Sequence, residues 1–241
     1  MERERARYVD VLRNRNFGLL WAGQVVSNFG DRFTYMAVVA TIVFNEGGSA
    51  MEAGGIFIAW SLPALIFGPI AGVFVDRYNK KRIMILCDIL RAGIVFLLPF
   101  TYSIIQIYVL MFLVSSVSRF FYPARNAMIP QLVEKGQLLV ANSLSQSTYE
   151  FSAIAGFAIG GMLVGIMGPN NVFYLDVATY FVSAITIYFI AFVPIGKKLE
   201  DAGNALSRIK MELLEGLVYS YREKRVFFIL SIFSITMLFF G

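Results

Sequence analysis

The chain has 241 residues, of which 58% are hydrophobic and 15% are charged, and its formal net charge is +5. An ordinary globular domain is about 45–50% apolar and about 25% charged, so this composition excludes a typical soluble domain and indicates a membrane protein. The sequence contains no histidine and a single cysteine, Cys87. These counts exclude an intramolecular disulfide, a histidine metal site and a histidine-based catalytic triad.

The first residues, 1–16, read MERERARYVDVLRNRN and mix acidic with basic side chains. They lack the short apolar core and the cleavage site of a secretory signal. We therefore predict a cytoplasmic N-terminal segment.

Long apolar runs follow, and a helix needs about 20 apolar residues to cross a bilayer core of about 30 Å. The sequence predicts a transmembrane bundle over 17–194, with spans at 17–42, 53–75, 82–101, 104–124, 142–166 and 171–194. Residues 195–225 are polar with apolar side chains at helical spacing, which predicts an amphipathic cytoplasmic linker. The run 226–241 predicts a truncated seventh transmembrane helix.

Basic residues lie in alternate connectors between the predicted spans. Four of them, Arg77, Lys80, Lys81 and Arg82, fall between the second and third spans, and Arg125 and Lys135 fall between the fourth and fifth. Because cytoplasmic loops are enriched in Lys and Arg, both ends of the six-span block are expected to face the cytoplasm. The net positive charge therefore indicates orientation, and no nucleic-acid partner is expected.

An internal repeat relates the two halves of this block. A shift of 87 or 88 residues aligns Arg32 with Arg119, Gly68 and Gly72 with Gly156 and Gly160, and Asp88 with Asp176. Because each unit has three spans, the second copy must be inverted in the membrane. We predict an all-α integral membrane fold, a six-helix bundle of two inverted three-helix repeats, which is a recurring plan of secondary transporters.

The stretch SNFGDRFTYMAV places Asp31 and Arg32 inside the first apolar run. At 1.5 Å per residue from Phe17, Asp31 lies roughly 21 Å along the span, where an ionisable side chain faces the bundle interior or a watery cavity. Neighbouring helical residues point about 100° apart, so Arg32 cannot readily pair with Asp31. We predict that Asp31 binds a proton or cation, with Glu150 as a second candidate. The alternative is a structural carboxylate paired with an arginine or a helix end elsewhere.

The loop GVFVDRYNKKR, through Gly72, Asp76, Arg77, Lys80 and Lys81, resembles the signature loop of the major facilitator superfamily. Asn79 stands where that signature has a second glycine, and Asn tolerates the left-handed conformation that the turn would need. The resemblance implies a cytoplasmic gate built on Asp76 and Arg77, with close helix approach at Gly72. The alternative is a set of ordinary cytoplasmic charges.

The stretches WAGQVVSNFGD, NAMIPQLVEKGQL and MELLEGLVY resemble the drug-exporter subgroup that includes the macrolide efflux proteins. In span five, Gly156, Gly160 and Gly161 resemble the antiporter signature, although Phe157 replaces its proline; a plain packing seam is the alternative. Drug antiporters also often carry an arginine in mid-span four. Here Arg119 lies about a turn nearer the cytoplasm, and Arg32 and Arg119 are candidates for a substrate or charge network.

This resemblance implies the N-terminal half of a proton-coupled efflux transporter for a drug-like or macrolide-like amphipathic small molecule, working by alternating access in the plasma membrane. Its expected partners are the substrate, protons, the lipid bilayer and a C-terminal six-helix half beyond these 241 residues. The alternatives are an exporter of lipid, lysolipid or siderophore, and a non-transporting membrane sensor or scaffold. The sequence contains no phosphate loop, nucleophile motif or metal-ligand cluster, so we expect no enzymatic activity, cofactor or metal.

Overall fold

The computed structural model describes residues 8–45 and 50–191, with a few isolated positions between 222 and 232. Residues Met1–Ile195 belong to one compact unit and Gly196–Gly241 to another. Every regular element in the two continuous ranges is helical, so the all-α class is confirmed there. The predicted linker, 195–225, and the predicted seventh helix, 226–241, lie outside these ranges.

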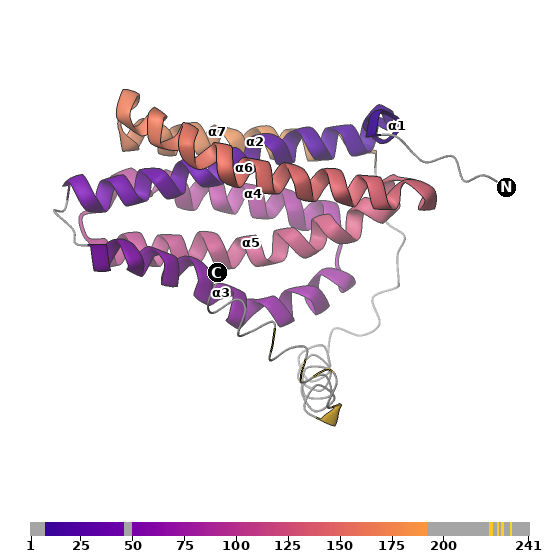
Figure 1. Ribbon diagram of the computed structural model, residues 1–241, viewed down its shortest axis with the longest axis horizontal. Coiled ribbons are helices and arrows are strands. Elements are labelled where there is room, and N and C mark those ends of the chain that lie inside the picture. The colour runs from indigo at the N-terminus through magenta and orange to yellow at the C-terminus, as the bar shows by residue number, and fades with distance from the viewer. Residues whose placement is uncertain are drawn as a thin grey trace. The chain divides into compact units, whose positions relative to one another are not determined.

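The described part of the first unit contains one short helix and six long ones (Figure 1). Most of the six long helices run roughly along the longest dimension of the picture. A π-helical turn at Thr41–Asn45 and two 3-10 turns, at Leu98–Phe100 and Lys135–Gln137, complete the described elements. The helices are α1 (Tyr8–Arg13), α2 (Arg15–Ala40), α3 (Ala50–Arg77), α4 (Lys80–Phe96), α5 (Ile104–Leu132), α6 (Leu138–Met167) and α7 (Pro169–Tyr188).

Asparagine side chains set the starts of two of these helices. The Asn14 side chain accepts hydrogen bonds from the backbone N–H groups of Asn16 and Phe17, and so caps α2. The Asn79 side chain accepts from the backbone N–H of Arg82 and caps α4. The φ of Asn79 is −67°, so this residue is an extended N-cap and does not adopt the left-handed conformation expected from the loop signature.

Prolines lie inside two of the long helices without ending them. The fourth span was predicted to end at 124, but α5 continues to Leu132 with Pro123 and Pro130 inside it. Neighbouring groups in a membrane bundle can satisfy the carbonyls that a proline leaves free, so a helix can run through it. In α3, the segments Gly54–Gly68 and Ile70–Arg77 meet at 58°. The break falls at Pro69, which has no N–H for the helical ladder.

The packing of the long helices follows the internal repeat. Helix α2 packs on α6 and α7, whereas its repeat mate α5 packs on α3 and α4, and α4 packs on α7. Exchanging the two halves maps the two contacts of α2 onto the two contacts of α5, and maps the contact between α4 and α7 onto itself. The start of α2 also meets the residues that follow α7, where the Asn16 side chain exchanges two hydrogen bonds with the backbone of Ala191, at 3.2 and 3.0 Å.

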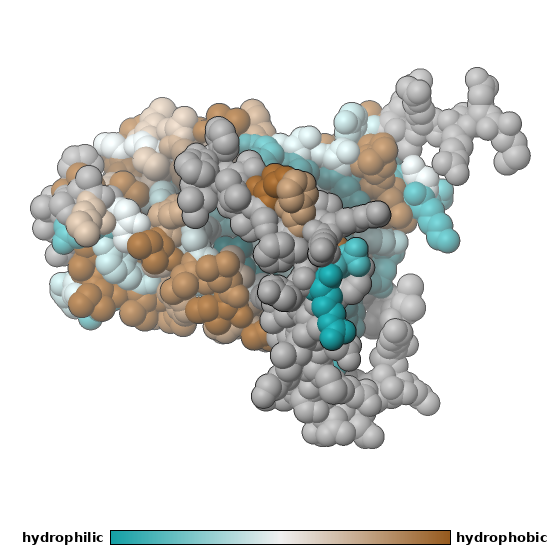
Figure 2. Space-filling view, turned by 60° about the horizontal axis from the view of Figure 1, so that its bottom comes forward, coloured by the Kyte–Doolittle hydropathy of each residue, from teal (hydrophilic) through white to brown (hydrophobic). Residues whose placement is uncertain are grey.

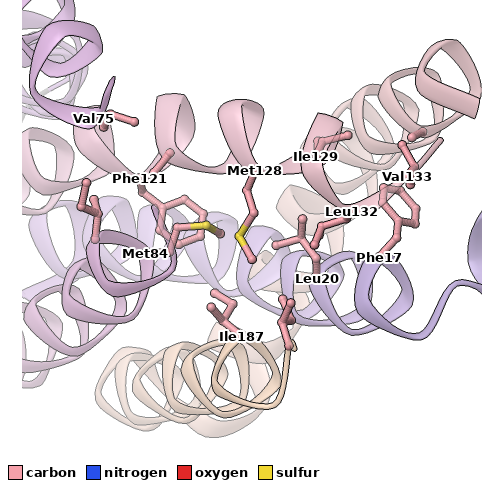
Figure 3. Close-up of a cluster of buried hydrophobic side chains, with 14 of the residues drawn as sticks. Phe17, Leu20, Val75, Met84, Phe121, Met128, Ile129, Leu132, Val133 and Ile187 are labelled. Atoms are coloured by element: carbon pink, nitrogen blue, oxygen red, sulfur yellow. The ribbon is translucent and has the colours of Figure 1, made fainter. Parts of the chain in front are cut away.

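Two hydrophobic clusters occupy the two ends of the bundle. The first joins α2, α4, α5 and α7 through side chains that include Leu20, Met84, Phe121, Met128 and Ile187 (Figure 3). The second gathers residues from the other end of the same helices, among them Phe33, Val95, Met111 and Phe173. Along α2 and α4, the buried charged residues lie between the residues of the first cluster and those of the second.

The outer surface carries large apolar side chains, and Figure 2 shows them gathered in patches on one face. Leu65, Ile105, Ile154 and Ile166 are each more than 60% exposed. Within the described residues, Lys80–Phe100, Ile104–Leu132 and Lys135–Met167 are long and apolar enough to cross a membrane, and the bent α3 adds a fourth if its two parts form one span. Helices α2 and α7 are not among them because their polar side chains lower their hydropathy, so six spans stay a prediction.

Candidate functional site

Arg91 is the centre of a buried charge network at the middle of the bundle. It is 1% exposed, and its guanidinium bonds the carboxylate of Asp88, three residues earlier on α4. A second guanidinium nitrogen lies 3.9 Å from Oδ1 of Asp31 on α2. The same Oδ1 atom accepts a hydrogen bond of 2.5 Å from the hydroxyl of Tyr180 on α7. Asp31 therefore joins three helices.

Aromatic rings cover the remaining sides of this guanidinium. The central carbon of Arg91 lies 4.3 Å from the ring centroid of Phe121 and 4.5 Å from that of Tyr180. A cation held over a ring face is attracted by its quadrupole, by about 2 kcal/mol or more when the pair is desolvated. The network thus combines two carboxylates with two ring faces around one cation.

A third buried carboxylate, Asp176 on α7, lies in the same part of the bundle. Its two oxygens accept hydrogen bonds from the hydroxyls of Thr34, at 2.5 Å, and Thr179, at 2.8 Å. Gly30 makes room for this arrangement, because a Cβ there would collide with the side chains of Asp176 and Thr179. Among the described residues, no cation lies within 4.0 Å of Asp176, since the ion pairs in that part of the chain both involve Arg91.

The charges of this network do not balance. Asp31, Asp88 and Asp176 together outnumber the one buried guanidinium that faces them. An uncompensated charge in a membrane interior is costly, so these carboxylates depend on Arg91 and on the hydroxyl groups that donate to them. The described residues contain no group of three or more potential ligand side chains that could hold a metal ion.

The two predicted coupling residues occupy different environments. Asp31 is 5% exposed and belongs to the network. Glu150 is exposed on α6 and accepts a hydrogen bond of 2.6 Å from the Gln146 side chain, one turn earlier. The structure therefore does not bring Glu150 into the network around Arg91.

The predicted pair Arg32 and Arg119 is half-buried and lies outside that network. Arg32 points away from its chain neighbour Asp31 and lies over the rings of Tyr149 and Phe157, at 5.1 and 5.3 Å. Arg119 donates to the hydroxyl of Ser115, at 3.2 Å. The divergence of Asp31 and Arg32 is the one expected of adjacent helical residues.

The glycines of span five differ in what they contact. A Cβ at Gly156 would lie 2.9 Å from the Cβ and Cγ of Arg32, and one at Gly160 would lie 3.2 Å from the Cα of Phe33. At Gly161 the nearest atom would be the terminal carbon of Met36, at 3.6 Å. The first two glycines therefore permit the close packing of α6 on α2, as the packing-seam alternative requires.

The signature-loop residues have separate surroundings. A Cβ at Gly72 would meet no atom within 4 Å in the described part of the chain, so the close approach expected there is not observed. The ammonium group of Lys80 donates to the backbone oxygen of Asp76, at 2.9 Å, and both Asp76 and Arg77 are at least partly exposed. Lys81 instead donates to the backbone oxygens of Tyr188 and Ile190, at 2.7 and 2.8 Å.

Sequence reasoning missed the central cation and two of its partners. Arg91, Tyr180 and Phe121 were not candidates, and Asp88 and Asp176 entered only as repeat mates. A signal was present for α4, because Asp88 and Arg91 stand three residues apart inside an apolar run, which predicts an intrahelical pair. No local signal marks Tyr180, because a tyrosine in a membrane span is common.

Residues 20–241 match the family model described as Major Facilitator Superfamily. The chain is 31% identical over 206 residues to the uncharacterized MFS-type transporter YfiS of Bacillus subtilis, covering 84% of the chain and 48% of YfiS. It is 29% identical to macrolide efflux protein A of Streptococcus pyogenes, covering 92% of the chain and 55% of that protein. Its identity with the multidrug efflux pump Tap of Mycolicibacterium fortuitum is 27%, over 75% and 45% of the two chains.

The chain spans about half the length of the curated relatives that it matches. The family match and the resemblance of the loop GVFVDRYNKKR agree, and so do the helical architecture and the helices able to cross a membrane. On this evidence the chain belongs to the Major Facilitator Superfamily of membrane transporters.

Proposed function

We propose that the protein containing this chain exports amphipathic small molecules across the plasma membrane by alternating access, with proton entry as the driving force. Support comes from relatives that are named as a macrolide efflux protein and a multidrug efflux pump. In this proposal the six long helices form one bundle of two inverted repeats, and they rock against a second bundle around a central site.

The observation that carries this proposal is the position of Asp31 between Arg91 and Tyr180. Its Oδ1 atom lies within 3.9 Å of the guanidinium and accepts the tyrosine hydroxyl, so protonation of Asp31 would weaken its contact with Arg91. Because the partners lie on α4 and α7, protonation at this one oxygen changes the contacts among three helices. A proton can thereby bias the bundle between two arrangements.

The signature loop is the proposed cytoplasmic gate. Lys81 holds the carbonyl groups at the end of α7, so the loop before α4 and the end of α7 would move together. Asp76 and Arg77 remain available at the surface for contacts that change during the transport cycle. This assignment includes a cytoplasmic location for the loop, as the distribution of basic residues predicts.

The test is Asp31→Asn in the full-length protein, reconstituted in vesicles with an imposed proton gradient. Asn has nearly the same size as Asp but cannot carry the proton, so gradient-driven export of a fluorescent amphiphilic drug should fall to the background level. Protein yield and the elution profile in detergent should stay close to those of the wild type, because Asn can still accept from Tyr180.

Glu150→Gln is the matched control, since it removes one acidic group from an exposed position on α6. We expect it to retain most of the export rate. If Asp31→Asn exports at the wild-type rate with an unchanged response to the gradient, Asp31 is structural. Loss of export in Glu150→Gln alone would instead assign coupling to Glu150.

A further inference from the structure

Five aromatic side chains form a half-buried row across α2, α3, α5 and α6. We call this set, Tyr35, Trp60, Tyr122, Tyr149 and Phe157, the aromatic row. The ring of Tyr35 meets that of Trp60 at 6.3 Å and that of Phe157 at 5.6 Å between centroids. The rings of Tyr122 and Tyr149 meet at 6.1 Å. Arg32 joins these two groups, because its guanidinium lies over both Tyr149 and Phe157.

Arginines lie along this row. Arg32 is near its middle, and the guanidinium of Arg125 lies 5.4 Å from the ring centroid of Tyr122 at one end. At the other end, Ser115 donates to the backbone oxygen of Trp60 and accepts from Arg119. The row therefore combines ring faces with cations from two helices that the repeat relates, α2 and α5.

Two of these cations carry hydrogen-bond donors with no acceptor. The Nε atoms of Arg32 and Arg119 are buried and lack a hydrogen-bond partner among the described residues. Buried donors are almost always satisfied in folded proteins, so these two are candidates for a ligand contact. Two carboxylates next to these contacts are engaged elsewhere: Asp31, which precedes Arg32, with Arg91 and Tyr180, and Glu150, which follows Tyr149, with Gln146.

The side chains of the aromatic row and its arginines favour a ligand with a negative charge. A guanidinium matches the geometry of a carboxylate, sulfonate or phosphate and binds it through two parallel hydrogen bonds. Ring faces and edges accept a planar apolar body. Aromatic rings alone would also attract a cation, but the charges of Arg32 and Arg119 would repel it.

From these contacts we propose that the aromatic row is a binding site for an amphipathic anion, with its acidic group at Arg32, its apolar body on the rings, and the charge of Arg119 adding to the attraction. This rests on the proposed function only in identifying that anion as the exported molecule. Binding itself can be measured without transport.

The experiment uses the full-length protein in detergent and two fluorescent probes with the same ring system. One is 8-anilinonaphthalene-1-sulfonate, and the other is N-phenyl-1-naphthylamine, which lacks the sulfonate. We expect Arg32→Gln to weaken binding of the sulfonate probe by about tenfold or more, since hydrogen bonds to charged groups contribute about 1.5–3 kcal/mol. Arg119→Gln should act in the same direction. Binding of the neutral probe should stay within about twofold in both variants, because this probe lacks the sulfonate that the guanidinium groups would bind. A twofold change in affinity corresponds to less than about 0.5 kcal/mol.

Two further variants keep the result interpretable. Arg32→Lys retains the charge but not the fork, so its affinity for the sulfonate probe should lie between those of the wild type and Arg32→Gln. Arg13→Gln removes an exposed arginine of α1 and should change neither affinity.

Equal affinity of wild type and Arg32→Gln for the sulfonate probe would overturn the proposal. So would an equal loss for both probes, because the site would then be apolar and not selective for anions. Sulfonate-dependent binding without gradient-driven export would contradict the proposed function and leave this site in place. Gradient-driven export by a protein that binds the two probes equally well would support the proposed function and contradict the anion site.

Discussion

Arg91 is buried inside the bundle among two carboxylates and two aromatic rings, although its Nε atom has no hydrogen-bond partner among the described residues. Asp88 and Asp31 compensate its charge, and the rings of Phe121 and Tyr180 cover its faces. The carboxylates of this group depend on Arg91, because removing the single cation leaves their charges uncompensated.

Arg91→Gln should therefore destabilise the protein strongly. Loss of one partner from a buried ion pair costs about 3–5 kcal/mol, and here two carboxylates lose the same cation. We expect a clearly lower Tm in detergent, measured by the fluorescence of a thiol-reactive dye or by loss of the monodisperse peak on heating. The double variant Asp88→Asn/Arg91→Gln should recover part of the loss, because it removes one of the stranded charges.

Arg77→Gln serves as the control, since Arg77 lies at the end of α3 and is not fully buried. Its Tm should stay within the error of the wild type. A Tm for Arg91→Gln equal to that of Arg77→Gln would show that the network contributes little to stability.

Helix α2 is the element around which the described unit is organised. It packs closely on α7 at Gly23 and Gly30, and on α6 at Gly156 and Gly160. Small residues let membrane helices approach until backbone and side-chain stems touch. The repeat mates of the α6 glycines are Gly68 and Gly72. A Cβ added at either of them would lie more than 4 Å from any atom of another helix in the described residues. Related positions in the two repeats therefore have different packing.

Gly156→Ala should be destabilising, whereas Gly165→Ala on the same helix should be neutral or slightly stabilising. The added methyl group at 156 would lie 2.9 Å from Arg32, and overpacking of this kind costs about 1–3 kcal/mol. At 165 nothing lies within 4 Å, and alanine is the better helix former by about 1 kcal/mol.

The two Tm values, measured under the same detergent conditions, test this difference. Equal shifts in both variants would mean that α6 can move away from α2 without cost, and the close packing at Gly156 would not matter for stability.

At the scale of the whole described unit, α2 begins and α7 ends at the same end of the bundle. The bonds between Asn16 and Ala191 bring the beginning of α2 next to the residue that follows α7. A chain that returns to its starting side has crossed an even number of times, which agrees with six spans. The exposed apolar surface supplies the contact with lipid (Figure 2).

Cysteine labelling in intact cells tests the proposed orientation. In a Cys87→Ala background, Tyr102→Cys should react with a membrane-impermeant maleimide from outside, because Tyr102 is 87% exposed in the connector before α5. Gly136→Cys, in the connector before α6, should react only after permeabilisation, because the distribution of basic residues predicts a cytoplasmic location for that connector. The opposite pattern would contradict the predicted orientation, and labelling of both sites from outside would contradict the predicted crossing by α5.

Several features of this protein follow from its sequence alone. The long helices overlap the predicted spans because hydropathy over about 20 residues is a local property that the bilayer selects. The burial of Asp31 was predictable in the same way, since a carboxylate in an apolar span has to avoid lipid. The divergence of Asp31 and Arg32 needed only the geometry of a helix.

The partners of these residues were decided by the tertiary structure. Tyr180 lies 149 residues from Asp31, and only the packing of α2 against α7 brings their oxygens within 2.5 Å. Arg91 turns from a local partner of Asp88 into the centre of a network because α4 also packs on α5 and α7. Asn79, which replaces the second glycine of the family signature, becomes a helix cap, and Gly72, which matches the signature, has no atom of a neighbouring helix near it in the described residues. A sequence pattern specifies what one helix can do, whereas the contacts of a side chain depend on which helices pack beside it.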